Sequence, residues 1–82
     1  MNAVAARARA MTPRRIELLT LAAQGNTNRQ IAKHLNISQD VVVQHFKFVY
    51  RALGAYDRAH AVALGIRYGY ISTDNIRPKA AA

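Results

Sequence analysis

The feature that most constrains the fold of this chain is a pair of helix signals separated by a very short turn. Thr27 and Gln30 have the spacing of a capping box, in which two side chains satisfy backbone N–H groups at a helix start. The helix is short, because Asn36 follows soon after and asparagine tolerates a left-handed turn. Ser38 is suited to cap the next helix. Two helices joined this tightly are typical of a helix-turn-helix.

The second helix of the pair, predicted over residues 38–53, has two distinct faces. Its apolar side chains recur at steps of four, three and four, as one buried helix face requires: Val42, Phe46, Val49 and Leu53. The opposite face carries Asp40, Val43, Gln44, Lys47 and Arg51. The helix-turn-helix is therefore predicted over residues 28–53, with one face of its second helix in a core and the other available to a ligand.

Further helix signals flank this motif and predict an all-α fold of four helices. Thr12 and Pro13 suit the N-cap and the first position of a helix, and Gly25 suits its left-handed end. A fourth helix is predicted over residues 58–68. We expect the folded domain to span residues 11–71, with a flexible basic arm or a loose helical extension at 1–10 and a flexible tail at 72–82.

The charge of the chain indicates a polyanionic partner. Lysine and arginine number 12 against 4 acidic residues, which gives a net charge of +8. Nucleic acid, an anionic membrane and an acidic protein are the candidates. No apolar run approaches the roughly 20 residues of a membrane span, so we expect no membrane partner and a cytoplasmic location.

The residues that carry enzyme chemistry are sparse. The acidic residues stand at positions 17, 40, 57 and 74, and none pairs with a nucleophile at a recognisable spacing. Cysteine is absent, and the three histidines are 11 and 15 residues apart, so no short pair has the spacing of metal ligands. We expect neither an enzyme nor a metal or other cofactor, and we place His34 and His60 on the surface.

The outer face of the 38–53 helix carries side chains that suit DNA bases. In a helix-turn-helix the second helix lies in the major groove of double-stranded DNA. Gln44 can make paired hydrogen bonds to adenine, Lys47 can reach guanine acceptors, and Val43 can contact a thymine methyl group. The alternative is a solvated face without a ligand, because ordinary three-helix bundles show the same pattern.

Phosphates would be contacted by backbone N–H groups at the helix starts and by neighbouring polar side chains. The candidates are Asn28, Lys33, Ser38, His45 and Arg51. For His45 the alternative is a partly buried packing role.

The motifs between Thr12 and Tyr70 resemble the DNA-binding domain of LuxR-type bacterial transcription regulators. That domain opens with Leu-Thr-Pro-Arg-Glu and has a Leu-Gly-Ile-Ser turn. The corresponding segments here are Met11-Thr12-Pro13-Arg14-Arg15 and Leu35-Asn36-Ile37-Ser38. Leu53-Gly54 and Arg58-Ala59-x-Ala61-Val62 follow in the family's order. The chain departs from the pattern where Arg15 replaces a glutamate, Val41 and Val43 replace threonine and lysine, and Phe48 replaces a polar residue.

The resemblance implies a sequence-specific regulator of transcription that binds an inverted repeat as a homodimer. In the family the fourth helix pairs two subunits, which here places the interface on Ala59, Val62, Ala63, Leu64 and Ile66. The chain resembles members that stand alone, without a sensor or receiver domain. A second hypothesis is a protein-interaction module of the same fold that binds RNA polymerase or another regulator through Val43 and Phe48. A third is non-specific packaging of nucleic acid.

Overall fold

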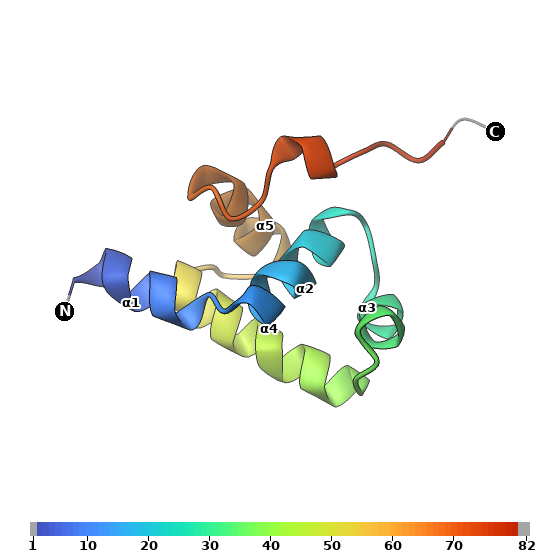
Figure 1. Ribbon diagram of the computed structural model, residues 1–82, viewed down its shortest axis with the longest axis horizontal. Coiled ribbons are helices and arrows are strands. Elements are labelled where there is room, and N and C mark those ends of the chain that lie inside the picture. The colour runs from blue at the N-terminus through green and yellow to red at the C-terminus, as the bar shows by residue number, and fades with distance from the viewer. Residues whose placement is uncertain (1, 81–82) are drawn as a thin grey trace.

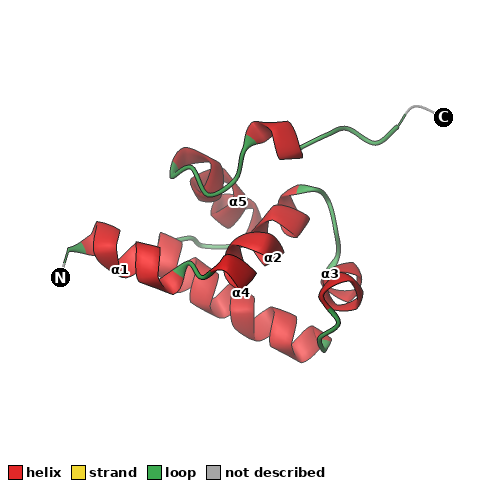
Figure 2. Ribbon diagram, in the orientation of Figure 1, coloured by secondary structure: helices red, strands yellow, loops and turns green. Residues whose placement is uncertain are grey.

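The computed structural model describes residues 2–80, and every regular element in that range is helical (Figures 1 and 2). The elements are α1 (Ala3–Ala10), α2 (Pro13–Ala23), α3 (Asn28–Leu35), α4 (Gln39–Leu53), α5 (Arg58–Arg67) and a short 3-10 helix, η1 (Thr73–Asn75). The predicted all-α class is confirmed. The four predicted helices correspond to α2–α5, and α1 is an additional helix.

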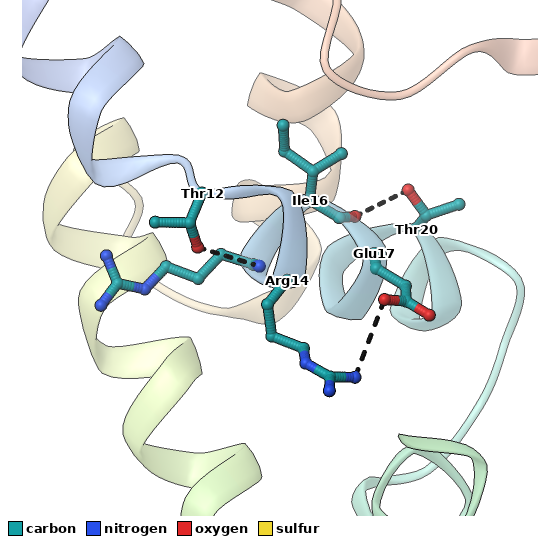
Figure 3. A network of polar contacts seen from close by, with 6 residues as sticks. Thr12, Arg14, Ile16, Glu17 and Thr20 are labelled. Carbon is teal, nitrogen blue, oxygen red and sulfur yellow. Dashed lines mark hydrogen bonds and ion pairs between the residues drawn. The ribbon is translucent and has the colours of Figure 1, made fainter.

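The start of α2 follows the predicted capping chemistry. Thr12 Oγ1 accepts a hydrogen bond from the backbone N–H of Arg15 at 3.3 Å (Figure 3). Pro13 occupies the first helical position. Arg14 lies 3.8 Å from the Glu17 carboxylate one turn later. Gly25 follows the helix with a φ of +91°, a conformation that glycine adopts without steric cost, so the chain turns there as predicted.

The turn between α3 and α4 is the one that the sequence predicts. Thr27 and Gln30 form both hydrogen bonds of the capping box, at 3.2 and 2.8 Å. Asn36 ends α3 in the left-handed conformation, with a φ of 55°. Ser38 Oγ then accepts from the backbone N–H of Val41 at 3.2 Å. These caps fix the angle at which α4 leaves α3.

The core lies where α4 crosses the other helices. Its fully buried large side chains come from three helices and are Leu18, Leu19, Ile31, Val42 and Val49. The helices α1, α2, α3 and α5 all contact α4, which runs along one side of the molecule (Figure 1). Val42, Phe46, Val49 and Leu53 are buried, so the predicted inward face of this helix is confirmed.

Helix α5 packs closely on α2 at Gly65. A β-carbon at this position would lie 2.9 Å from Leu19 Cδ2 and 2.9 Å from Ile71 Cδ1. Both neighbours are buried, at 0% and 2% exposure. The absence of a side chain at Gly65 therefore sets the separation of α5 from the core.

Over residues 1–10, where the sequence predicts a flexible arm or a loose helical extension, the structure has the helix α1 in contact with α4. Asn2 caps a helix by accepting from the backbone N–H of Ala5 at 2.8 Å. Arg15 Nη1 donates to the carbonyl of Ala10 at 2.7 Å, and the Arg7 guanidinium lies 3.7 Å from the centroid of the Tyr68 ring. Alanine has the highest helix propensity, and these two arginines attach the helix to the domain. Met1 lies outside the described residues.

The segment after α5 is partly ordered against the domain. Ile71, the last residue of the predicted domain, is buried. Within the predicted tail, η1 covers Thr73–Asn75 and residues 76–80 have no regular structure. Residues 81 and 82 lie outside the described residues.

Candidate nucleic-acid interface

The helix-turn-helix presents one continuous outer surface. On α4, five side chains opposite the buried face are exposed: Asp40, Val43, Gln44, Lys47 and Arg51. Lys33 of α3 is exposed as well. In Figure 1 the helix α3 and the first turns of α4 lie at the lower right, away from α5 at the top. This end of the molecule is therefore open to a large ligand.

The three predicted base-contacting residues lie on one stripe of α4. Val43, Gln44 and Lys47 are separated by one and three positions, and helical residues three or four apart share a face. Val43 is 40% exposed. Among residues 2–80, neither Gln44 nor Lys47 makes a side-chain hydrogen bond or ion pair. Their polar groups are consequently available to a partner.

The predicted phosphate-contacting residues differ in how the protein holds them. Lys33 and Arg51 are exposed. Ser38 uses its oxygen to cap α4, which leaves its hydroxyl hydrogen as a donor. Asn28 is half-buried and accepts a hydrogen bond through Oδ1 from Arg58 Nη1 at 2.6 Å. Only the amide N–H₂ of Asn28 remains for an outside acceptor.

His45 is half-buried beside two arginines of α2. Burial lowers the pKa of His45 below its usual value, and the charges of Arg15 and Arg14 lower it further. A lowered pKa keeps the imidazole neutral near neutral pH. The surroundings combine the two predicted roles of His45, because the ring is partly packed and stands near cations that would attract a phosphate.

Two departures from the family pattern, Arg15 and Phe48, contact each other. The Arg15 guanidinium lies 4.3 Å from the Phe48 ring centroid, and that of Arg51 lies 5.9 Å away on the same ring. Arg15 also donates to Ala10 at the end of α1. Phe48 remains 44% exposed. Its ring therefore supports the arginine that holds α1 against α4.

Arg58 is a residue whose role the sequence analysis missed. Its guanidinium donates to Asn28 Oδ1 and to the carbonyl of Asn26, and lies 4.8 Å from the Phe46 ring centroid. The only signal in the sequence was its place in the quoted Arg58-Ala59 motif. The motif does not reveal which groups accept hydrogen bonds from this arginine, because they lie about 30 positions away in the chain.

Two of the acidic residues have partners within the protein. Glu17 pairs with Arg14, and Asp57 caps α5 by accepting from the backbone N–H of His60 at 2.9 Å.

Within the described part of the chain, no three histidine or acidic side chains gather into a set of metal ligands. None of the helices described is both long and apolar enough to cross a membrane.

Comparison with known proteins identifies the domain. The family described as "Bacterial regulatory proteins, luxR family" matches residues 9–64, which is more than half of the chain. The chain belongs to this family. The match contains α2, α3 and α4 whole, and most of α5. The family is one of bacterial regulatory proteins, and the matched residues include both helices of the helix-turn-helix, α3 and α4.

Individual relatives are named as regulators of transcription. The chain is 40% identical over 62 residues to the transcriptional activator protein BjaR1 of Bradyrhizobium diazoefficiens, covering 76% of this chain and 26% of that protein. It is 46% identical over 56 residues to the probable transcriptional regulatory protein SgaR of Hyphomicrobium methylovorum, covering 68% and 26%. The chain thus spans about a quarter of the length of these two relatives.

Proposed function

We propose that this luxR-family domain binds double-stranded DNA sequence-specifically, with α4 in the major groove, as a homodimer on an inverted repeat. The observation that carries the proposal is the outer stripe of α4. Gln44 and Lys47 are exposed there without partners among the described residues, on the side opposite the buried Val42 and Phe46. A rigid helix with one anchored face can place these side chains against base edges.

Base recognition is assigned to the middle of α4 rather than to its first turn. Val41 and Val43 stand where the family has polar and basic residues, and each is 40% exposed. Valine offers only apolar contact, such as with a thymine methyl group. Gln44 is therefore proposed to read adenine and Lys47 to read guanine.

The DNA backbone is proposed to be held by the residues that surround this stripe. Lys33 and Arg51 supply charge, Ser38 and Asn28 supply hydrogen-bond donors, and His45 lies beside Arg14 and Arg15. Each neutralised phosphate releases counterions, which makes the affinity fall steeply with salt. The net charge of +8 supports this part of the proposal.

The second subunit is proposed to pair through α5. Ala59, Val62, Ala63 and Ile66 have the spacing of one helix face, with the two alanines exposed and the other two half-buried. Leu64 is also half-buried but shares its face with the buried Ala61 and Gly65, so it would border the interface. A two-fold dimer would read half-sites with the same symmetry.

The test compares base-contacting with phosphate-contacting variants on a duplex enriched from a random pool. Gln44→Ala and Lys47→Ala should each lose about 1–3 kcal/mol of discrimination at one base step. Lys33→Ala should weaken binding to all duplexes alike and lower the salt slope by about one. If all three variants weakened every duplex equally, the assignment of base recognition to α4 would be refuted.

The exposure of Val41 and Val43 favours one second candidate function. The apolar N-terminal part of α4 could dock on RNA polymerase or another regulator, as an alternative to reading bases. This function predicts that the wild-type chain binds no DNA even at low salt, where phosphate contacts are strongest.

A further inference from the structure

Arg58 joins three parts of the domain through one guanidinium group. Nη1 donates to Asn28 Oδ1 at 2.6 Å, and Nη2 donates to the Asn26 carbonyl just before α3. The guanidinium also lies 4.8 Å from the ring centroid of Phe46, on the buried face of α4. Since Arg58 is the first residue of α5, the start of α5 is tied directly to both helices of the helix-turn-helix.

This contact fixes the orientation of the Asn28 amide. Arginine has five N–H donors and no acceptor, so only the amide oxygen of Asn28 can face it. The N–H₂ group is thereby turned away from Arg58. Asn28 is the first residue of α3, and its side chain is held from α5 rather than by a neighbour on its own helix.

The space beside Asn28 is open and suited to an anion. A hollow of about 580 Å³ there is lined by Asn26, Thr27, Asn28, Arg29, Gln39 and Arg58, with Gly25 and Ala22. None of these residues is acidic. A backbone phosphate has acceptor oxygens only, so it matches a fixed N–H₂ donor in a hollow that Arg29 and Arg58 also line.

We infer that Arg58 is a positioning residue for DNA binding: it orients the Asn28 amide so that Nδ2 donates to a backbone phosphate. The inference rests on the proposed function and deepens it. In this role Arg58 acts through Asn28: its Nη1 and Nη2 each donate within the protein, to Asn28 Oδ1 and to the Asn26 carbonyl. The neighbouring Ala59 belongs to the proposed α5 pairing face, so the same short segment connects dimer formation with the DNA backbone contact.

The test is a double-mutant cycle between Arg58 and Asn28, measured as affinity for the enriched duplex. Asn28→Ala should weaken binding about tenfold, the usual effect of one hydrogen bond to a charged group. Arg58→Lys keeps the charge but loses the planar fork, and should weaken binding by a similar factor. The double variant should bind no more weakly than the weaker single variant. Arg67→Lys, an exposed arginine of the same helix, serves as the matched control and should bind like wild type.

A second variant separates positioning from mere stabilisation. Asn28→Asp keeps an oxygen acceptor for Arg58 but replaces the N–H₂ donor with a charge that repels phosphate. Its unfolding midpoint should equal or exceed that of wild type, while its DNA affinity falls more than tenfold. This comparison holds even if Arg58→Lys fails to fold.

Several outcomes would overturn the inference. Additive losses in the double variant would mean that Arg58 acts independently of Asn28. Arg58→Lys could bind DNA like wild type while Arg58→Gln lost affinity and showed a reduced salt slope. That result would mean that Arg58 contacts a phosphate directly through its charge. Wild-type affinity for Asn28→Asp would remove the phosphate contact. A wild-type chain that binds no DNA would instead refute the proposed function itself.

Discussion

Gly65→Ala is a sharp test of how α5 is seated on α2. The new β-carbon would meet Leu19 Cδ2 and Ile71 Cδ1 at 2.9 Å and Ile71 Cγ1 at 3.3 Å. The first two distances are shorter than carbon atoms tolerate without movement, since optimal contact is about 3.5–4.0 Å. Leu19 and Ile71 are buried, so their side chains have little room in which to move aside.

Two opposing effects set the magnitude. Alanine in a helix interior is more favourable than glycine by about 0.5–1 kcal/mol. Overpacking a well-packed core costs about 1–3 kcal/mol. The expected net result is a loss of about 1 kcal/mol of stability, which lowers the unfolding midpoint of a domain of this size by roughly 4–8 °C.

The assay is thermal unfolding followed by circular dichroism, at a protein concentration low enough to hold the monomer. Ala63→Gly is the matched control, because it reports the propensity effect at an exposed position of the same helix. A Gly65→Ala variant with a raised midpoint would refute the reasoning. It would show that the α2–α5 contact yields to one methyl group and does not fix the position of α5.

Two further predictions concern the proposed DNA contacts and the dimer. The pKa of His45 is lowered in the free protein by burial and by Arg15 and Arg14, so stability should be constant above the usual histidine pKa and decrease as pH falls below it. The free protein thus favours the neutral imidazole, whereas a phosphate contact would favour the protonated one. DNA affinity should therefore rise by up to about tenfold per unit of falling pH. If the DNA affinity of His45→Gln had the same pH profile as that of wild type, His45 would have a packing role and no phosphate contact. Val62→Glu should convert the dimer to a monomer with unchanged helix content, as measured by sedimentation, whereas the exposed control Ala8→Glu should not. An unchanged mass for a folded Val62→Glu would exclude pairing through this face of α5.

The elements that local chemistry specifies could be predicted from the sequence. The capping box at Thr27 and Gln30, the left-handed Asn36 and the cap at Ser38 each depend on residues within a few positions of one another. The buried face of α4 follows from its periodicity. The helix-turn-helix and the exposed stripe with Gln44 and Lys47 could therefore be placed from the sequence alone.

Contacts between distant segments could not be predicted in the same way. Helix α1 has a hydrophobic pattern too weak to predict docking, and it is held by Arg15 and by the stacking of Arg7 on Tyr68, 61 positions later. Arg58 likewise reaches back 30 positions to Asn28. A sequence shows that these arginines are present but not which acceptors or rings the fold brings beside them.

The contact between Arg15 and Phe48 gives a physical account of two unusual residues. Each alone departs from the family pattern, and Arg15 removes the glutamate that would complete a capping box at the start of α2. In the fold the arginine lies 4.3 Å from the aromatic ring centroid and donates to the last residue of α1. A cation over an exposed ring contributes about 0.5–1 kcal/mol, which helps to explain why the segment before α2 is docked.

The most direct test of the account is selection of duplexes from a random pool by the wild-type chain, repeated with Gln44→Ala. The account predicts an enriched motif of two symmetric half-sites about one helical turn apart, and a relaxed preference at one base step of each half-site in the variant. Binding at low salt without enrichment of any motif would contradict it, because α4 would then hold DNA without reading its sequence.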